Sequence, residues 1–205
     1  MIINRIPMVE KIYIVTPCYR PANLAVIEKS INFDLIYRWY IIYDTTRNRT
    51  YTRRYPGHPK IIEVESSDIG ISGNAQRNCG LNLAEDGFVY FLDDDNVVHP
   101  DLWSEIPKMT LDHYYSWDQL RNPTGDDTDW ALFKNEKGKI LKGHTLKLQH
   151  IDTAQVMIPK KFFEGLTWKI DDYKADGILI ESVYQKNPSS HIYIPKVMCY
   201  YNHLG

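Results

Sequence analysis

Uninterrupted apolar and aromatic runs mark the first strands of this chain. Strands are predicted at residues 11–17, 39–43 and 61–64, whose apolar runs are Ile-Tyr-Ile-Val, Trp-Tyr-Ile-Ile-Tyr and Ile-Ile. Unbroken β-branched and aromatic runs are typical of strands buried on both faces of a sheet. Between the first two runs, apolar residues recur about every 3.6 positions, which predicts a helix from Asn23 to Phe33. The strand–helix–strand order predicts an α/β domain with a mostly parallel central sheet flanked by helices.

A second helix and a fourth strand follow, and the strand ends in acids. Glycines at 70 and 73 lead into a predicted helix through Leu81 and Ala84, with Gly87 just past its end. The apolar run 88–92 then continues directly into three aspartates at 93–95. These carboxylates fall at the carboxyl edge of the sheet, where open α/β sheets bind ligands. A solvated acidic turn is the alternative interpretation.

Three adjacent carboxylates repel one another unless a positive charge lies among them. Mg²⁺ and Mn²⁺ prefer oxygen ligands and commonly share them with substrate phosphates. The acids at 93–95 therefore predict a divalent cation that holds a diphosphate.

The second half of the chain gives weaker signals. Residues 110–150 are polar and irregular, with a hairpin turn predicted at 135–139. Their aromatic residues either form a wall that stacks on an acceptor sugar or pack beneath a long loop. Strands are predicted at 154–158, 191–195 and 197–201, and helices near 162–163 and through 178–184. The aromatic residues in question are Tyr114, Tyr115, Trp117 and Trp130.

Composition narrows the class of protein. A chain of 205 residues supports one sizeable core, so we expect a single domain, with a nucleotide-binding half at about 1–100 and an acceptor-binding half at about 101–205. The 24 basic and 26 acidic residues nearly balance, which argues against nucleic acid or an anionic membrane as the main partner. No apolar run approaches the roughly 20 residues of a membrane span. The start does not resemble a secretory signal, and three cysteines without a CxxC pair favour reduced thiols. The expected location is cytoplasmic.

Four stretches together resemble glycosyltransferases of the GT-A fold, and most closely the β-1,3-glucuronosyltransferase-like group. They are Thr-Pro-Cys-Tyr-Arg-Pro at 16–21, Gln-Arg-Asn at 76–78, the strand and acids at 89–96, and Tyr-Asn-His at 201–203. The stretches come in the family's order and cover nearly the whole chain. The resemblance implies a nucleotide-diphosphate sugar as donor, with uridine diphosphate expected, a saccharide hydroxyl as acceptor, and Mn²⁺ or Mg²⁺ as cofactor.

The resemblance also assigns roles to individual residues. Asp95 would be the principal metal ligand, and Asp176, before a late helix, would be the catalytic carboxylate. The glucuronosyltransferases have Glu at that place, carry a membrane anchor and stem, and do not match residues 110–150 of this chain. The donor-binding residues that the resemblance implies are Pro17, Tyr19 and Arg20 around the nucleoside, Asp44 at the base, Arg77, Asp93 at the ribose, Asp94, and His203 at the diphosphate.

Elementary chemistry is consistent with this set of residues. A glycoside hydrolase usually needs two carboxylates because its leaving group must be protonated. A nucleoside diphosphate leaves as an anion, so a metal can stabilise it and one base suffices for the acceptor hydroxyl. Attack opposite the departing phosphate would invert the anomeric carbon. The base could instead be Asp171, Asp172 or Glu181.

Alternative interpretations exist for single residues and for the whole chain. Arg77 could be a surface helix residue in a salt bridge, Asp44 could only cap a turn, and His203 could fray near the end of the chain. A non-catalytic nucleotide-sugar or carbohydrate-binding module would have the same fold. A sugar nucleotidyltransferase is the weaker rival, because residues 16–20 lack the glycines of its phosphate loop.

Overall fold

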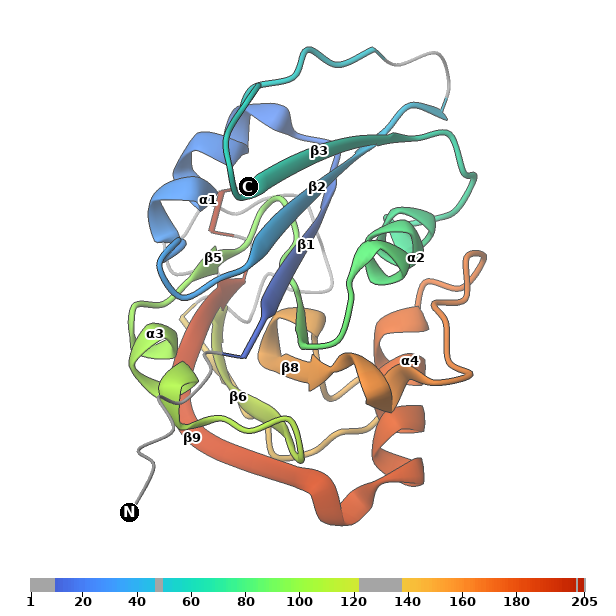
Figure 1. The fold of residues 1–205 in the computed structure, drawn as a ribbon. Helices are drawn as coiled ribbons and strands as arrows, with labels where there is room; N and C mark the ends of the chain where they lie inside the picture. The colour runs from blue at the N-terminus through green and yellow to red at the C-terminus, as the bar shows by residue number, and fades with distance from the viewer. Residues whose placement is uncertain (1–9, 47–49, 122–137, 202, 205) are drawn as a thin grey trace, which may run out of the picture.

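A computed structural model describes residues 10–46, 50–121, 138–201 and 203–204. Its centre is a curled sheet with strand order β3-β2-β1-β4-β8-β6-β9-β5, and β7 pairs with β6. Helices α1 and α3 lie on one side of the sheet, and α2 and α4 lie on the other (Figure 1). The helices span Leu24–Ser30 (α1), Asn74–Leu83 (α2), Asp101–Glu105 (α3) and Ala175–Lys186 (α4). The strands are Ile12–Cys18 (β1), Arg38–Asp44 (β2), Ile61–Ser66 (β3), Phe88–Phe91 (β4), Val97–Val98 (β5), Tyr114–Arg121 (β6), Ile140–Leu141 (β7), Val156–Pro159 (β8) and His191–Tyr201 (β9).

The first part of the sheet is parallel, as the sequence predicts. Strands β1, β2, β3 and β4 all run in one direction. The whole sheet is mixed, however, and the prediction of a mostly parallel sheet is wrong for the second half. Strand β8 runs antiparallel to both β4 and β6, and β5 antiparallel to β9. A buried apolar run looks the same in either direction, so the sequence does not show this reversal.

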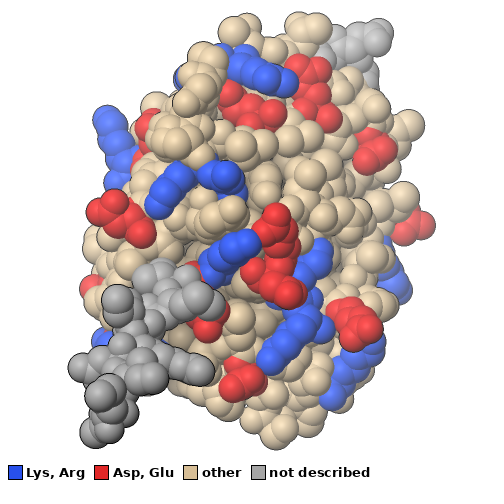
Figure 2. All heavy atoms as spheres, in the orientation of Figure 1, with Lys and Arg blue, Asp and Glu red and all other residues tan. Residues whose placement is uncertain are grey.

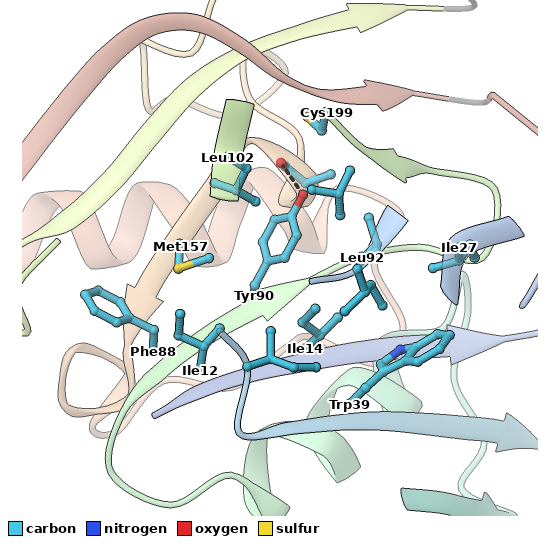
Figure 3. Close-up of a cluster of buried hydrophobic side chains, with 14 of the residues drawn as sticks. Ile12, Ile14, Ile27, Trp39, Phe88, Tyr90, Leu92, Leu102, Met157 and Cys199 are labelled. Carbon is cyan, nitrogen blue, oxygen red and sulfur yellow. Dashed lines mark hydrogen bonds between the residues drawn. The ribbon is translucent and has the colours of Figure 1, made fainter. Parts of the chain in front are cut away.

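Two apolar clusters fill the two sides of the sheet. The first packs α1 and α3 against β1, β4 and β8, with Tyr90 at its centre (Figure 3). The Tyr90 hydroxyl donates to the Ala154 carbonyl at 3.1 Å, so this buried ring keeps its polar atom paired. The second cluster packs α2 and α4 against the opposite face.

The region 110–150 holds the largest difference from the sequence prediction. Residues 114–121 form strand β6 inside the sheet. Tyr114, Tyr115 and Trp117 are almost fully buried there, so they are packing residues and do not form an acceptor wall. Trp130 and most of the predicted 135–139 turn lie outside the described residues.

Two smaller predictions also change. Residues 160–163 form a short 3-10 helix, and the two predicted final strands are the single strand β9. Within the described residues, no helix is long and apolar enough to cross a membrane. The division into a nucleotide-binding and an acceptor-binding half stays a prediction.

Candidate functional site

The three aspartates after β4 diverge, and Asp94 faces inward. Its carboxylate accepts the backbone N–H groups of Tyr19 and Arg20 at 2.5 and 2.6 Å. Arg20 also donates to it through Nε and Nη2, at 3.0 and 2.7 Å. The Asn23 amide adds a bond to the Asp94 carbonyl at 2.8 Å. Asp94 therefore fastens the loop after β1 to the end of β4, which places Tyr19 and Arg20 beside the acids.

Replacing Asp94 should loosen this fastening. Asp94→Asn keeps the side-chain size but removes the charge that accepts four hydrogen bonds. Because bonds to charged groups contribute about 1.5–3 kcal/mol each, we expect the free energy of unfolding to fall by about 2 kcal/mol or more. Urea denaturation measures this change. Asp112→Asn is the control, since Asp112 is exposed and forms only a surface ion pair with Lys161. Equal stability of the two variants would contradict the assigned role.

Asp95 is partly buried and lies beside residues 203 and 204. Its side chain is 19% exposed and accepts Arg20 Nη2 at 2.8 Å. The backbone N–H groups of His203 and Leu204 donate to the Asp95 carbonyl at 2.9 and 3.1 Å. Burial, then the charge of Asp93, raises the pKa of the Asp95 carboxyl to about 7, against the lowering effect of Arg20. The structure thus places Asp95 and His203, which are far apart in sequence, beside each other.

Asp93 is paired with Arg77 from α2. Arg77 Nη2 donates to Asp93 Oδ1 at 2.5 Å, and Nη1 donates to the Ser72 carbonyl at 2.6 Å. The guanidinium also lies 4.9 Å from the centre of the Trp168 ring. Burial alone would lower the pKa of Arg77, but the charges of Asp93 and then Asp176 raise it, and the net pKa lies above its usual value. The guanidinium therefore stays charged. Arg77 is only 3% exposed, which excludes the alternative of a surface salt bridge.

The glycine at 73 makes room for this arginine. Gly73 has φ +77, and a Cβ there would lie 2.8 Å from Pro17 Cβ and 3.4 Å from Arg77 Nη1. The loop before α2 can therefore approach the end of β1 only without a side chain. Pro17 lies directly beneath this loop.

Asp176 occupies the first turn of α4. The pKa of its carboxyl is raised to about 7. Burial is the main cause, the charge of Asp93 adds to the increase, and Arg77 opposes it. These interactions connect Asp176 to the same charges that surround the acids after β4. The competing carboxylates have other surroundings: Asp172 accepts the Lys174 N–H at 2.8 Å, Glu181 accepts the Leu148 N–H at 3.1 Å, and Asp171 is exposed.

The nucleoside end of the candidate site lies across β1 and β2. Cys18 pairs with Tyr43 in the sheet, so Tyr19 and Asp44 come next to each other at its edge. Asp44 is 4% exposed and accepts the Thr46 N–H at 2.8 Å, which is a turn-capping contact. Beside it, the Tyr43 and Tyr51 rings stack with centres 4.9 Å apart. The capping role of Asp44 is present, and its contact with a base stays a prediction.

Two asparagines on α2 support the site, and neither had a structural role in the sequence-based prediction. Asn78 donates to the Trp168 carbonyl at 2.9 Å and accepts the Trp168 N–H at 2.8 Å. Asn74 donates to the carbonyls of Lys169 and Asp172, each at 2.9 Å. Asn74, Arg77 and Asn78 share one helix face because they are three and four positions apart. This face holds the segment that leads into α4 and Asp176.

Removing the Asn78 amide should release that segment. Asn78→Ala leaves the backbone N–H and carbonyl of Trp168 without their partner, a loss of about 1–3 kcal/mol in the free energy of unfolding. Chemical denaturation tests this value. Asn32→Ala provides the matched control, since Asn32 only caps an exposed turn at Asp34. A change no larger than that of the control would show that the segment is held by other contacts.

Asp152 is a buried carboxylate that sequence reasoning missed. Strand β4 pairs antiparallel with β8, with Tyr90 opposite Met157, so the residues before β8 lie level with the acids after β4. Asp152 accepts Gln119 Nε2 and the Ala154 N–H, both at 2.9 Å. Burial and then Asp93 raise the pKa of its carboxyl, and Arg121 lowers it. A single aspartate before a strand does not indicate a functional residue in the sequence. Only the register of β4 and β8 brings Asp152 level with the acids after β4.

The described residues contain no group of three His, Cys, Asp or Glu side chains arranged to hold a metal ion. A closed site made by protein ligands alone is therefore absent from this part of the chain. Mg²⁺ and Mn²⁺ at substrate phosphates need only one or two carboxylates, and oxygen ligands suit them. Asp95 fits this open kind of site, because its carboxylate is partly exposed. Burial and then the charge of Asp93 raise its pKa, and a cation beside it would favour the ionised form.

The face of the molecule shown in Figure 2 carries mixed charges: basic and acidic side chains lie beside one another and neither sign forms a continuous region. Ion pairs such as Lys11–Glu85 and Lys108–Glu105 occur in the described part of the chain.

Comparison with solved structures identifies the fold. The chain superposes on S. aureus TarS 1-349 in complex with UDP-GlcNAc with a TM-score of 0.66 at 13% identity, over 93% of this chain and 58% of that one. For the complex of the same protein with UDP, the TM-score is 0.64 at 15% identity, over 93% of this chain and 60% of that one. This chain therefore spans about three fifths of the length of these structures. No family model and no curated protein sequence matches the chain.

These likenesses define the class of fold. The chain has a GT-A-like glycosyltransferase fold, a single α/β domain with a curled mixed sheet. At such low identity the likeness concerns the fold alone.

Proposed function

We propose that this protein is a metal-dependent glycosyltransferase that moves a sugar from a nucleotide-diphosphate donor to a saccharide hydroxyl. The observation that carries the proposal is the convergence of Asp93 and Asp176 on the buried Arg77, with Asp95 two positions beyond Asp93 and paired with Arg20. These residues come from the end of β4, from α2, from α4 and from the loop after β1. Uridine diphosphate is the proposed nucleotide, supported by the UDP and UDP-GlcNAc bound in the TarS structures.

In this proposal the nucleotide lies along the carboxyl edge of β2, β1 and β4. Tyr19 and Asp44 border the nucleoside, and Arg20 is placed between them and the acids. Asp93 is held by Arg77 in a fixed orientation, which suits a carboxylate that accepts ribose hydroxyl groups. His203, anchored at the Asp95 carbonyl, would lie against the diphosphate.

Mn²⁺ or Mg²⁺ would be held by Asp95 together with the donor phosphates. The cation would supply electrostatic stabilisation of the departing diphosphate. The protein itself contributes Arg20, whose guanidinium already contacts Asp94 and Asp95 and adds positive charge at the same edge.

Asp176 would be the base. The acceptor oxygen forms a bond to the anomeric carbon while the bond from that carbon to the phosphate oxygen breaks. The diphosphate leaves with the electron pair, and the hydroxyl proton passes to the Asp176 carboxylate. A carboxyl whose pKa is raised to about 7 is well matched to general base catalysis near neutral pH. Attack from the face opposite the phosphate inverts the anomeric configuration.

A panel of nucleotide sugars tests the proposal. The protein is incubated with each donor, with and without Mn²⁺, and release of the nucleoside diphosphate is measured, with NMR of the product at the anomeric carbon. We expect Mn²⁺-dependent release from at least one UDP-sugar, with inversion. Binding of nucleotide sugars without any release would instead favour the non-catalytic binding module. Formation of a nucleotide sugar from a sugar phosphate would favour the nucleotidyltransferase.

We further propose that the protein is most similar to the β-1,3-glucuronosyltransferase-like group. Only the four sequence stretches support this assignment, because the TarS structures do not distinguish that group from other glycosyltransferases. The donor panel should therefore include UDP-glucuronic acid beside UDP-GlcNAc and UDP-glucose.

A further inference from the structure

Three exposed apolar side chains lie on the two segments that lead into α2 and α4. Ile69 is 82% exposed, Tyr173 is 73% exposed and Ile170 is 48% exposed. Ile69 and Tyr173 are the two most exposed large hydrophobic residues in the described part of the chain. We call Ile69, Ile170 and Tyr173 the apolar rim. Single exposed apolar residues are ordinary, but a group beside a candidate site indicates a binding surface.

The rim is built on two segments that are fastened to each other. The Ile71 N–H donates to the Ile170 carbonyl at 2.8 Å. Asn74 holds the carbonyls of Lys169 and Asp172 on either side of Ile170, each at 2.9 Å. Gly70 makes this close approach possible, because a Cβ there would lie 3.3 Å from the Ile170 carbonyl oxygen. The exposure of the rim therefore belongs to a fixed part of the fold.

The same two segments carry the charged residues of the candidate site. One segment runs through Ile69 into α2 and Arg77. The other runs through Tyr173 into α4, where the Ala175 N–H closes a turn on the Asp172 carbonyl just before Asp176. The apolar rim thus lies on the segments that lead directly into Arg77 and into Asp176, the residue proposed as the base.

We propose that the apolar rim binds the acceptor, and that Tyr173 stacks on the apolar face of its sugar ring. This inference rests on the proposed function and names the acceptor contact of that same site. A pyranose ring has a face of C–H groups that suits an aromatic side chain, while its hydroxyl groups at the edge can reach Asp176. The size of the rim supports a small occupant: three side chains match one ring, whereas a stable protein interface needs about 800 Å² and 20–30 residues on each partner.

Two substitutions at Tyr173 test the stacking directly. Tyr173→Ala removes the ring, and Tyr173→Phe keeps it without the hydroxyl. With UDP-glucose, UDP-GlcNAc and UDP-glucuronic acid as donors, one measures hydrolysis by water and transfer to a series of methyl glycosides. For Tyr173→Ala we expect the KM for the glycoside to rise at least tenfold while hydrolysis stays within twofold of wild type. Tyr173→Phe should stay within threefold in both. Tyr37→Ala, at a partly exposed tyrosine that contacts Lys11 and Arg38, is the control and should change neither rate.

Other results would contradict either the acceptor site at the rim or the proposed function. An unchanged KM in Tyr173→Ala overturns the rim as acceptor site. So does donor hydrolysis without transfer to any methyl glycoside, since a rim that recognises one ring should accept some of them. A wild-type dimer in light scattering that Tyr173→Ala dissociates would assign the rim to a second copy of the chain. If the wild type releases UDP from none of the donors, the proposed function itself fails, and this inference fails with it.

Discussion

Asp176→Asn is expected to lower the rate of sugar transfer by about 10²–10⁴-fold, which is the usual contribution of a general base. The variant keeps the size of the side chain and removes the group that receives the acceptor proton. Binding of UDP should stay within about twofold of wild type, because the residues proposed to bind the nucleotide lie on β1, β2 and the end of β4. Steady-state transfer assays and calorimetric titration with UDP measure the two effects.

The same residue sets the expected pH dependence. The pKa of the Asp176 carboxyl is raised to about 7, and only its ionised form can accept a proton. The wild-type transfer rate should therefore rise with pH through about 7 and level off above it. Asp171→Asn is the control, since that carboxylate is exposed and should leave the rate unchanged. Transfer retained in Asp176→Asn, or lost equally in Asp171→Asn, would move the base to another residue.

Asp95→Asn should remove the dependence of nucleotide binding on the metal. Wild-type protein is expected to bind UDP at least tenfold more tightly with Mn²⁺ than without it. In the variant this ratio should fall to near one, because a neutral amide is a poor ligand for a hard cation. Titration of UDP at fixed Mn²⁺ and in EDTA measures the ratio. Asp68→Asn, at a carboxylate that contacts Ser66 near the end of β3, is the control. A ratio that Asp95→Asn leaves unchanged would show that another group holds the cation.

The sequence predicted the first half of the fold, through β4, well. Strands β1, β2 and β4 and helix α2 have strong local signals, namely buried apolar runs and a glycine-marked helix start. Their carboxyl ends meet at one edge in a parallel arrangement, so the positions of Tyr19, Asp44 and the three aspartates follow from the order of the elements alone.

Strand β6 could not be predicted because its polar residues are satisfied only by distant partners. Ser116 and Asp118 lie within the strand and are buried. The Ser116 hydroxyl donates to the Gly143 carbonyl at 2.6 Å, and the Tyr193 hydroxyl donates to Asp118 at 2.6 Å. In β6 both the aromatic and the polar residues are buried. Without knowledge of these distant contacts, such a sequence is predicted to be a loop.

Long-range contacts also determine the roles of Asp152, Asn78 and Arg77. Asp152 reaches the site only because β8 runs antiparallel to β4. Asn78 acts on Trp168, which is distant in sequence, and Arg77 is buried by that same tryptophan. Residues that act through long-range backbone contacts leave no local pattern, whereas residues at the ends of strands do.

A crystal structure with UDP and Mn²⁺, recorded with the anomalous signal of manganese, tests the central claim most directly. The account predicts a manganese peak about 2.0–2.3 Å from an Asp95 carboxylate oxygen and shared with the diphosphate, with the Asp176 carboxylate facing the end of that diphosphate. A manganese ion bound elsewhere, or a UDP molecule that lies away from the edge of β1, β2 and β4, would contradict it.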